Sequence, residues 1–348
     1  MVRAPDNEVC YAAWQAATML LRVSAPAWRH GSGGSMIVEI DGIGTARAAS
    51  ASGQHERPER RGRCRVASGV SGGGRALVLG GGGVTGVAWE TGLLLGLAEA
   101  GIELAMADLF VGTSAGSVVA AQLTSGLSLD QLFAAQVAPA SGEIAARMNP
   151  ATLVRFVLAM AWPGDSQRAR ARLGRAALRA KTVPEAQRRA VIASRLPTPD
   201  WPRQRLLITA VNAETGAAVV FDRDSGVSLV DAVAASCAVP LVWPPITIKG
   251  QRYIDGGMRS VANVDLAKGY ERVVVIAPLT AAPRRANRPA AQAATLGAGV
   301  RSVIVSPERA ARAAIGSNVL DPAHRAASAQ AGRRQAAGVA DRVRAVWA

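Results

Sequence analysis

The chain has 348 residues, of which 49% are hydrophobic and only 4% aromatic, and its formal net charge is +15. This length fits one large domain or two smaller ones. The charge favours an anionic partner, but no zinc-finger or RNA-binding signature accompanies it, so we expect a membrane surface and no nucleic acid. The three cysteines, Cys10, Cys64 and Cys237, form no CxxC pair, which fits a reducing, cytoplasmic compartment.

Residues 1–70 differ in composition from the rest of the chain. Residues 30–35 and 68–74 are rich in Gly and Ser, and a basic run occupies 57–65. We expect a disordered N-terminal extension here. The apolar stretch 9–21 is too short for a membrane span and lacks the flanks of a signal peptide, so neither is expected.

Two strand–turn–helix units open the part that is expected to fold. Residues 76–79 are an apolar run bounded by glycines, and helical periodicity follows over 84–100. A second apolar run at 109–111 leads into an apolar helix over 117–124. Two such units in series predict an α/β fold with a parallel sheet.

The remainder of the chain continues the mixed pattern. Residues 130–200 are expected to be mainly helical, and residues 281–298 are expected to form a mobile loop. Hairpin signals join 206–211 to 217–221 and 246–248 to 252–254. The other expected elements are a helix at 229–236, strands at 273–277 and 303–305, and a C-terminal helix from Asp321-Pro322 to Trp347.

The motif Gly112-x-Ser114-x-Gly116 lies between a predicted buried strand and a predicted helix. Glycine at both flanks permits a tight strand-to-helix turn that exposes the serine hydroxyl at the carboxyl end of the strand. The adjacent helix N-terminus offers free N–H groups and a favourable dipole to a developing oxyanion. The pattern therefore predicts Ser114 as a nucleophile, although a tight turn without catalysis has the same pattern.

Consecutive glycines at 80–83 follow the first predicted strand. Their N–H groups can point into a concavity that suits an anion. The prediction is an oxyanion hole formed by the N–H groups of Gly82 and Gly83, with Ala115 as a third donor. Neither a serine nucleophile nor backbone oxyanion donors require a metal or a cofactor, so we expect none.

A nucleotide-binding interpretation competes for the same loop. Gly81-x-Gly83-x-x-Gly86 matches the dinucleotide fingerprint G-x-G-x-x-G. That fingerprint requires an acid at the end of the next strand, whereas here Asp108 precedes the strand. No Walker lysine follows the loop, which excludes a phosphate-binding P-loop.

Asp255-Gly256-Gly257 follows the second predicted hairpin. Alone, it reads as an ordinary Asp-Gly turn. Together with the two earlier motifs, it offers a carboxylate as the base for Ser114.

Histidine is the alternative base. His30 and His55 lie in the N-terminal extension, and His324 lies in the first turn of a predicted helix. The order Ser114, Asp255, His324 matches an α/β-hydrolase triad, so a Ser–His–Asp esterase stays open as an alternative.

The three motifs, in this order, resemble those of patatin-like phospholipases. The intervening Ala235-Ser-Cys-Ala-Val-Pro240, Pro244-Pro245 and Gly250-x-x-Tyr-Ile-Asp255 segments resemble that family as well. The resemblance implies a three-layer α/β/α sandwich around a mainly parallel sheet, in a catalytic domain over 71–330 with a C-terminal helix over 331–348 packed on it. It also implies hydrolysis of lipid acyl esters by a Ser114–Asp255 dyad, with Gly82 and Gly83 as oxyanion donors. Peripheral contact with a membrane is expected from the net charge alone.

One residue departs from the family pattern. Family members usually have Arg or Lys just before the last glycine of the first motif, and here that residue is Thr85. The backbone donors do not depend on this side chain, so the expectation of activity stands. A non-catalytic protein that binds a nucleotide or a membrane is the remaining alternative.

Overall fold

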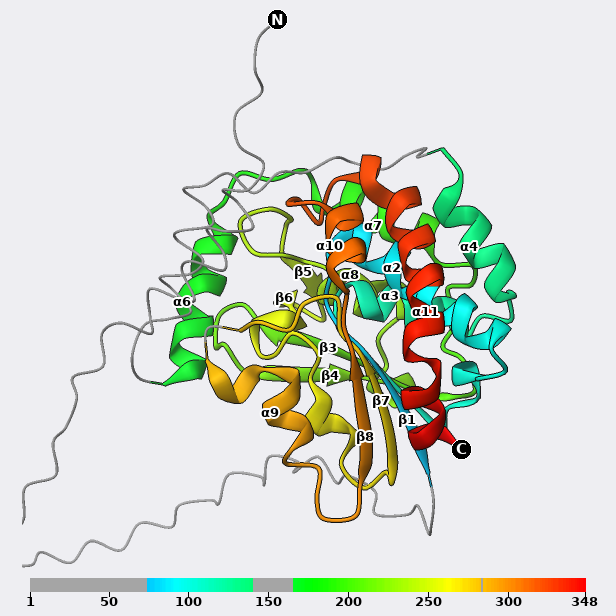
Figure 1. Cartoon of the computed structure of the whole chain (residues 1–348). Helices are drawn as coiled ribbons and strands as arrows, with labels where there is room; N and C mark the ends of the chain where they lie inside the picture. Colours follow the sequence, from blue (N-terminus) through cyan, green and yellow to red (C-terminus); the bar gives the residue numbers. More distant parts are fainter. Residues whose placement is uncertain (1–73, 140–164, 283) are drawn as a thin grey trace, which may run out of the picture.

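The computed structural model describes residues 74–139, 165–282 and 284–348. The expected extension at 1–70 and residues 140–164 of the region expected to be helical lie outside these residues. The described residues form an eight-stranded sheet with helices on both faces (Figure 1). In chain order, its strands are β1 Arg75–Leu79, β2 Leu109–Gly112, β3 Arg205–Asn212, β4 Ala218–Phe221, β5 Ile246–Ile248, β6 Gln251–Asp255, β7 Arg272–Ile276 and β8 Arg301–Val305.

The sheet is mainly parallel. Strands β3, β2, β1, β7 and β8 are parallel neighbours. Strands β4 and β6 pair with β3 in antiparallel fashion, and β5 pairs in the same way with β6. The predicted hairpins are thus β3–β4 and β5–β6. Both faces of the central strands are buried, since Leu77 and Leu79 of β1 enter one core cluster while Ala76 and Val78 enter another. The predicted α/β fold class with a mainly parallel sheet is confirmed.

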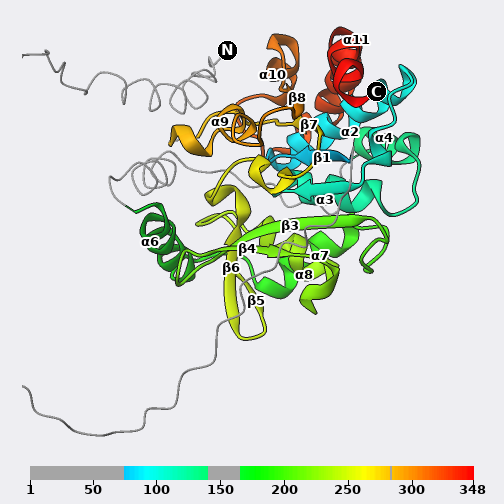
Figure 2. The same cartoon turned by 90° about the horizontal axis from the view of Figure 1, so that it is seen from below.

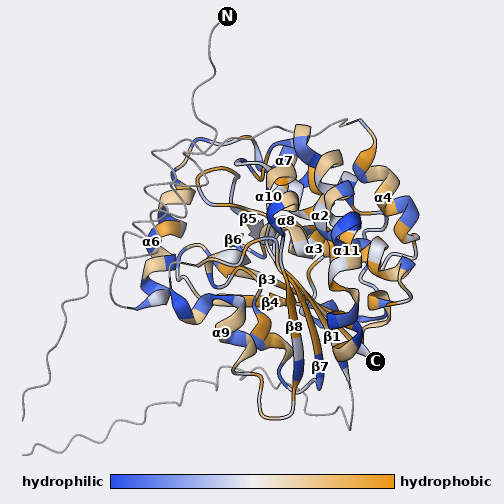
Figure 3. Cartoon of the chain, in the orientation of Figure 1, coloured by the Kyte–Doolittle hydropathy of each residue, from blue (hydrophilic) through white to orange (hydrophobic). Residues whose placement is uncertain are grey.

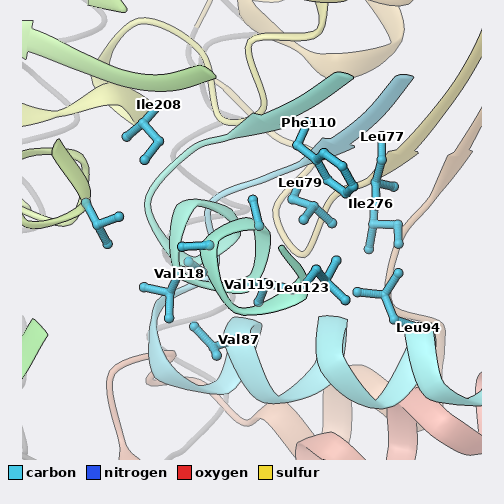
Figure 4. Close-up of a cluster of buried hydrophobic side chains, with 14 of the residues drawn as sticks. Leu77, Leu79, Val87, Leu94, Phe110, Val118, Val119, Leu123, Ile208 and Ile276 are labelled. Atoms are coloured by element: carbon cyan, nitrogen blue, oxygen red, sulfur yellow. The ribbon is translucent and has the colours of Figure 1, made fainter. Parts of the chain in front are cut away.

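Helices cover the face of the sheet that carries the larger core cluster (Figure 4). There, Leu79 and Phe110 of the strands pack against Val118 and Val119 of α3, with Leu94 of α2 behind them. The helices in the described part of the chain are α2 Gly83–Glu99, α3 Ala115–Leu123, α4 Leu129–Val137, α6 Ser166–Leu178, α7 Glu185–Arg195, α8 Leu229–Ser236, α9 Pro289–Ala293, α10 Arg309–Ile315 and α11 Arg325–Trp347.

The C-terminal helix α11 packs closely along α2. Glycines at the crossing let the backbones approach, because a Cβ on Gly92 would overlap the carbonyl of Ala329. Trp89 Nε1 donates to Gln335 Oε1 at 3.1 Å within this contact. Figure 2 shows α11 and α6 on opposite sides of the molecule, as Figure 1 also does.

Three sequence predictions need correction. Residues 281–298 contain the short helix α9, which begins at Pro289, a residue whose fixed φ suits the first helical position. Helix α3 begins at Ala115, two residues earlier than expected. The C-terminal helix is preceded by a separate 3-10 turn, Pro322–His324, and α11 itself begins at Arg325.

Candidate active site

The register of β3 brings the ends of two distant strands together. Ile208 pairs with Gly112 of β2 and with Phe221 of β4, and Ala210 pairs with Asp255 of β6 and with Val219 of β4. Because β4 occupies one edge of β3, β2 and β6 share the other edge. The two strand ends therefore meet only two β3 residues apart, which corresponds to roughly 7 Å along a strand.

Ser114 lies at the turn between β2 and α3. Its backbone has φ 51° and ψ −116°, a conformation that non-glycine residues rarely adopt. The turn is tight because a Cβ on Gly112 would lie 2.5 Å from Ser117 Cα, and one on Gly116 would overlap the Leu79 backbone. The glycines of this motif thus allow the close packing that the sequence predicted.

Hydrogen bonds to its N–H and to its carbonyl hold Ser114 in this strained conformation. Its N–H donates to Ser236 Oγ at 2.9 Å. Its carbonyl accepts from Ser117 Oγ at 2.6 Å and from Cys237 Sγ at 3.4 Å. Burial raises the pKa of the Cys237 thiol, which keeps the S–H available as a donor. The sequence prediction had no role for Ser236 or Cys237, although both lie in the Ala235–Pro240 segment.

Asp255 is a buried carboxyl group in contact with Ser114. Only 2% of the residue is exposed, and the Ser114 side chain is near enough to act on its pKa as a hydrogen-bond donor. Its Oδ1 accepts the Gly257 N–H at 2.7 Å. Burial raises the pKa of Asp255 to about 6, although the hydrogen bonds from Ser114 and Gly257 and the charge of Arg188 partly oppose this rise. A carboxylate with such a pKa is a better base than an ordinary aspartate.

The glycine-rich loop lies directly beside the nucleophile, since a Cβ on Gly81 would be 3.6 Å from Ser114 Cβ. The N–H groups of Gly80 and Gly81 donate to Ile276 and Val261, which anchors the loop. No backbone carbonyl of the described residues accepts the N–H of Gly82, Gly83 or Ala115 outside regular helix bonding. These donors are therefore available to an anion.

The same loop requires glycine at two positions. A Cβ on Gly82 would lie 2.5 Å from Pro278 Cβ, and one on Gly83 would lie 2.5 Å from the Val319 carbonyl oxygen. Gly83 also has φ 63°, which disfavours any residue with a side chain. Gly86, the last glycine of the motif, faces Pro278 at ordinary contact distance.

A buried polar network connects the nucleophile turn with the Asp255-Gly256-Gly257 turn. Asn263 Nδ2 lies within 3.0 Å of Thr113 Oγ1, 2.9 Å of the Ser260 carbonyl and 3.5 Å of the Gly256 carbonyl. Asn263 is fully buried and has φ 53°, a conformation that asparagine tolerates better than most residues. The network fixes the two turns relative to each other.

His324 is engaged away from these groups. Its Nδ1 lies 3.0 Å from the Ala314 carbonyl, and the residue is exposed. Within residues 74–139, 165–282 and 284–348, no group of three or more His, Cys, Asp or Glu side chains is arranged to hold a metal ion. No helix of these residues combines the length and apolarity that crossing a bilayer requires.

The family model of the patatin-like phospholipases matches residues 77–268, which include Gly81, Ser114 and Asp255. The chain belongs to the patatin-like phospholipase family. Membership in this family supports lipid hydrolysis as the activity of the chain, and the region matched is more than half of its length. The predicted resemblance is confirmed.

Solved structures and curated proteins add little to this assignment. The patatin-like chain aligns with VipD from Legionella pneumophila at 15% identity and a TM-score of 0.42, over 78% of this chain and 67% of VipD. It aligns with the type III effector protein ExoU at 16% identity and a TM-score of 0.35, over 78% of this chain and 53% of ExoU. The chain thus spans about half the length of ExoU. The search of curated proteins found no match.

Thr85 replaces the usual basic residue of the family and is fully buried. Its N–H and its Oγ1 both donate to the Val319 carbonyl, at 3.1 and 3.2 Å. A threonine at this position therefore anchors the glycine-rich loop to the segment before α11 without any charged side chain.

Proposed function

We propose that this patatin-like chain hydrolyses carboxylic esters of lipids with Ser114 as nucleophile and Asp255 as base. The observation that carries the proposal is the burial of both residues at the point where β2 and β6 meet on β3, near enough for the Ser114 side chain to lower the pKa of Asp255. The class covers phospholipase A, lysophospholipase and carboxylesterase reactions.

In the first step, Asp255 accepts the Ser114 proton while Oγ attacks the ester carbonyl carbon. The leaving alcohol takes a proton as the acyl-serine forms. With a pKa of about 6, Asp255 is mostly ionised at neutral pH and is ready to accept the proton. In the second step, Asp255 activates a water molecule, which releases the fatty acid and regenerates Ser114.

The oxyanion of each tetrahedral intermediate would accept hydrogen bonds from Gly82, Gly83 and Ala115. Support comes from the position of the loop next to Ser114 and from the lack of described backbone acceptors for these three N–H groups. One such donor is typically worth about 3 kcal/mol of transition-state stabilisation. The turn at Ser114 would then hold the hydroxyl beside these donors.

Turnover of p-nitrophenyl esters and of phospholipid by the full chain tests the proposal. Ser114→Ala and Asp255→Asn should each lower kcat by about 10³-fold or more, as removal of a nucleophile or base does in comparable enzymes. A fluorophosphonate probe should label the unsubstituted protein and not Ser114→Ala. Labelling of another serine, or full activity of Asp255→Asn, would refute the dyad.

His324→Ala separates the dyad from a Ser–His–Asp triad. The contact of His324 with the Ala314 carbonyl supports the dyad, so this variant should retain activity. Loss of activity with an unchanged thermal midpoint would favour the triad.

A further inference from the structure

Helix α6 carries an exposed basic stripe, which we define as Arg168, Arg172, Arg175 and Arg179. All four residues are exposed, and their spacings of four, three and four place them on one face of the helix. A helical repeat of 3.6 residues brings side chains at these spacings within about 60° of one another around the helix axis. The stripe therefore presents four cations in one direction.

The opposite face of α6 packs against the sheet. Ala169, Leu173 and Ala177 are buried, and a Cβ on Gly174 would overlap the backbone of Ala213. Arg170 Nε donates to the Gly216 carbonyl at 2.8 Å, which ties α6 to the turn between β3 and β4. Packing thus fixes the direction in which the stripe points.

Other arginines lie near the packed face of α6, and one of them, Arg259, is paired with Asp265. The charges of Arg259 and Arg284 act on Arg170, where burial and these charges lower the pKa of the guanidinium. Arg285 is exposed on the turn before α9. Figure 3 shows hydrophilic segments on α6 and on this turn. Two stripe arginines have acidic residues beside them: Arg168 Nε lies 4.0 Å from Asp165 Oδ2 at the N-cap of α6, and Arg175 Nη1 donates to the Glu214 carbonyl at 3.4 Å.

Helix α6 and the Ser114–Asp255 pair lie on different faces of the sheet. Leu173 of α6 packs with Val211 of β3 and Ile254 of β6, whereas alternation along β6 places Asp255 on the other face, with α8 and α11. A surface bound to the stripe would therefore lie on the side of the molecule away from α11 (Figure 2).

We propose that the basic stripe of α6 docks the protein on the surface of a bilayer that contains anionic lipids. The inference rests on the proposed function, because the ester substrates of a lipid hydrolase reside in such surfaces. Guanidinium groups bind phosphate oxygens through paired hydrogen bonds, and arginines aligned on a rigid helix meet a plane of headgroups together.

Sedimentation with vesicles tests the docking separately from catalysis. All proteins carry Ser114→Ala, so that none of them hydrolyses the vesicles during the measurement. The binding result is therefore independent of whether the proposed function is correct. The probes are vesicles of phosphatidylglycerol with phosphatidylcholine and vesicles of phosphatidylcholine alone. The stripe variant is Arg168→Gln, Arg172→Gln and Arg179→Gln. The matched control removes the same number of charges at Arg309, Arg334 and Arg342, which are exposed on α10 and α11.

The stripe variant should partition into anionic vesicles about 100-fold less, since each basic residue near an anionic surface strengthens binding roughly fivefold. Partitioning of the control variant should fall by less than about tenfold. Binding of the protein with an intact stripe should weaken steeply with added salt and be absent on phosphatidylcholine alone. Thermal midpoints check that each variant is folded.

Equal losses in the stripe and control variants would show a general effect of net charge and overturn the proposal. Binding that is indifferent to salt or to lipid charge would do the same. Retention on a short RNA, lost in the stripe variant, without retention on anionic vesicles would assign the stripe to nucleic acid instead.

Discussion

Asp255→Asn should make the protein inactive and more stable at neutral and alkaline pH. The amide can accept the Gly257 N–H as the carboxylate does, so the turn is preserved, but it cannot accept the Ser114 proton. Burial raises the pKa of Asp255 from 3.8 to about 6. A difference of about two pKa units at 1.36 kcal/mol per unit corresponds to about 3 kcal/mol of folding free energy.

The sign follows from proton binding. Below about pH 4 the carboxyl group is protonated in both the folded and the unfolded chain, so it contributes no difference there. Between about pH 4 and 6 the unfolded chain loses the proton while the folded chain keeps it, and the unsubstituted protein loses stability as pH rises. Above pH 6 the loss is complete, because the folded protein then holds a buried charge.

Urea unfolding of the unsubstituted protein and of Asp255→Asn over about pH 4 to 8 measures this difference. The variant should gain from near zero at the acid end to about 3 kcal/mol at the alkaline end, with the rise centred near pH 5. A gain that does not change with pH, or a variant less stable than the parent at pH 8, would show that Asp255 is not a buried carboxylate with a raised pKa.

Three further measurements address the same region. For the unsubstituted enzyme, kcat/KM should fall as pH decreases through about 6, because Asp255 must be ionised to accept the Ser114 proton; a flat profile down to pH 5 would contradict this. Ser236→Ala leaves the buried Ser114 N–H without its acceptor, which costs about 1–3 kcal/mol, so kcat should drop roughly tenfold or more with KM little changed; an unaltered kcat would remove Ser236 from the positioning of Ser114. Burial raises the pKa of the fully buried Glu90 well above its usual value of 4.5, so Glu90→Gln should match the parent in thermal midpoint below that pH and exceed it increasingly as pH rises, because the unfolded chain then ionises Glu90 while the folded chain keeps it protonated; equal midpoints up to about pH 10 would contradict this.

The sequence predicted the elements whose patterns are local. Apolar runs bounded by glycine marked β1 and β2, and turn signals marked the two hairpins. The glycine motifs indicated which residues gather around Ser114, and in the structure the Ser114 side chain is near enough to Asp255 to lower its pKa. The catalytic roles of these residues stay predictions, as do the domain limits.

The long-range relations had no local signal. That β2 and β6 share one edge of β3 depends on strand register across more than 140 residues, which no local pattern encodes. The hydrogen bonds of Ser236 and Asn263 with the turns of the site depend equally on tertiary packing. Helix α9 was missed because five residues are too few to show helical periodicity.

The Val319 carbonyl, which accepts two hydrogen bonds from Thr85, has a consequence for how the catalytic unit is delimited. Val319 lies 51 residues beyond the region that matches the family, residues 77–268. A chimera that exchanged only the matched region between two relatives would separate the glycine-rich loop from its own acceptor. A segment exchanged between two relatives must therefore extend past Val319 and include α11 if the glycine-rich loop is to keep its acceptor and its packing.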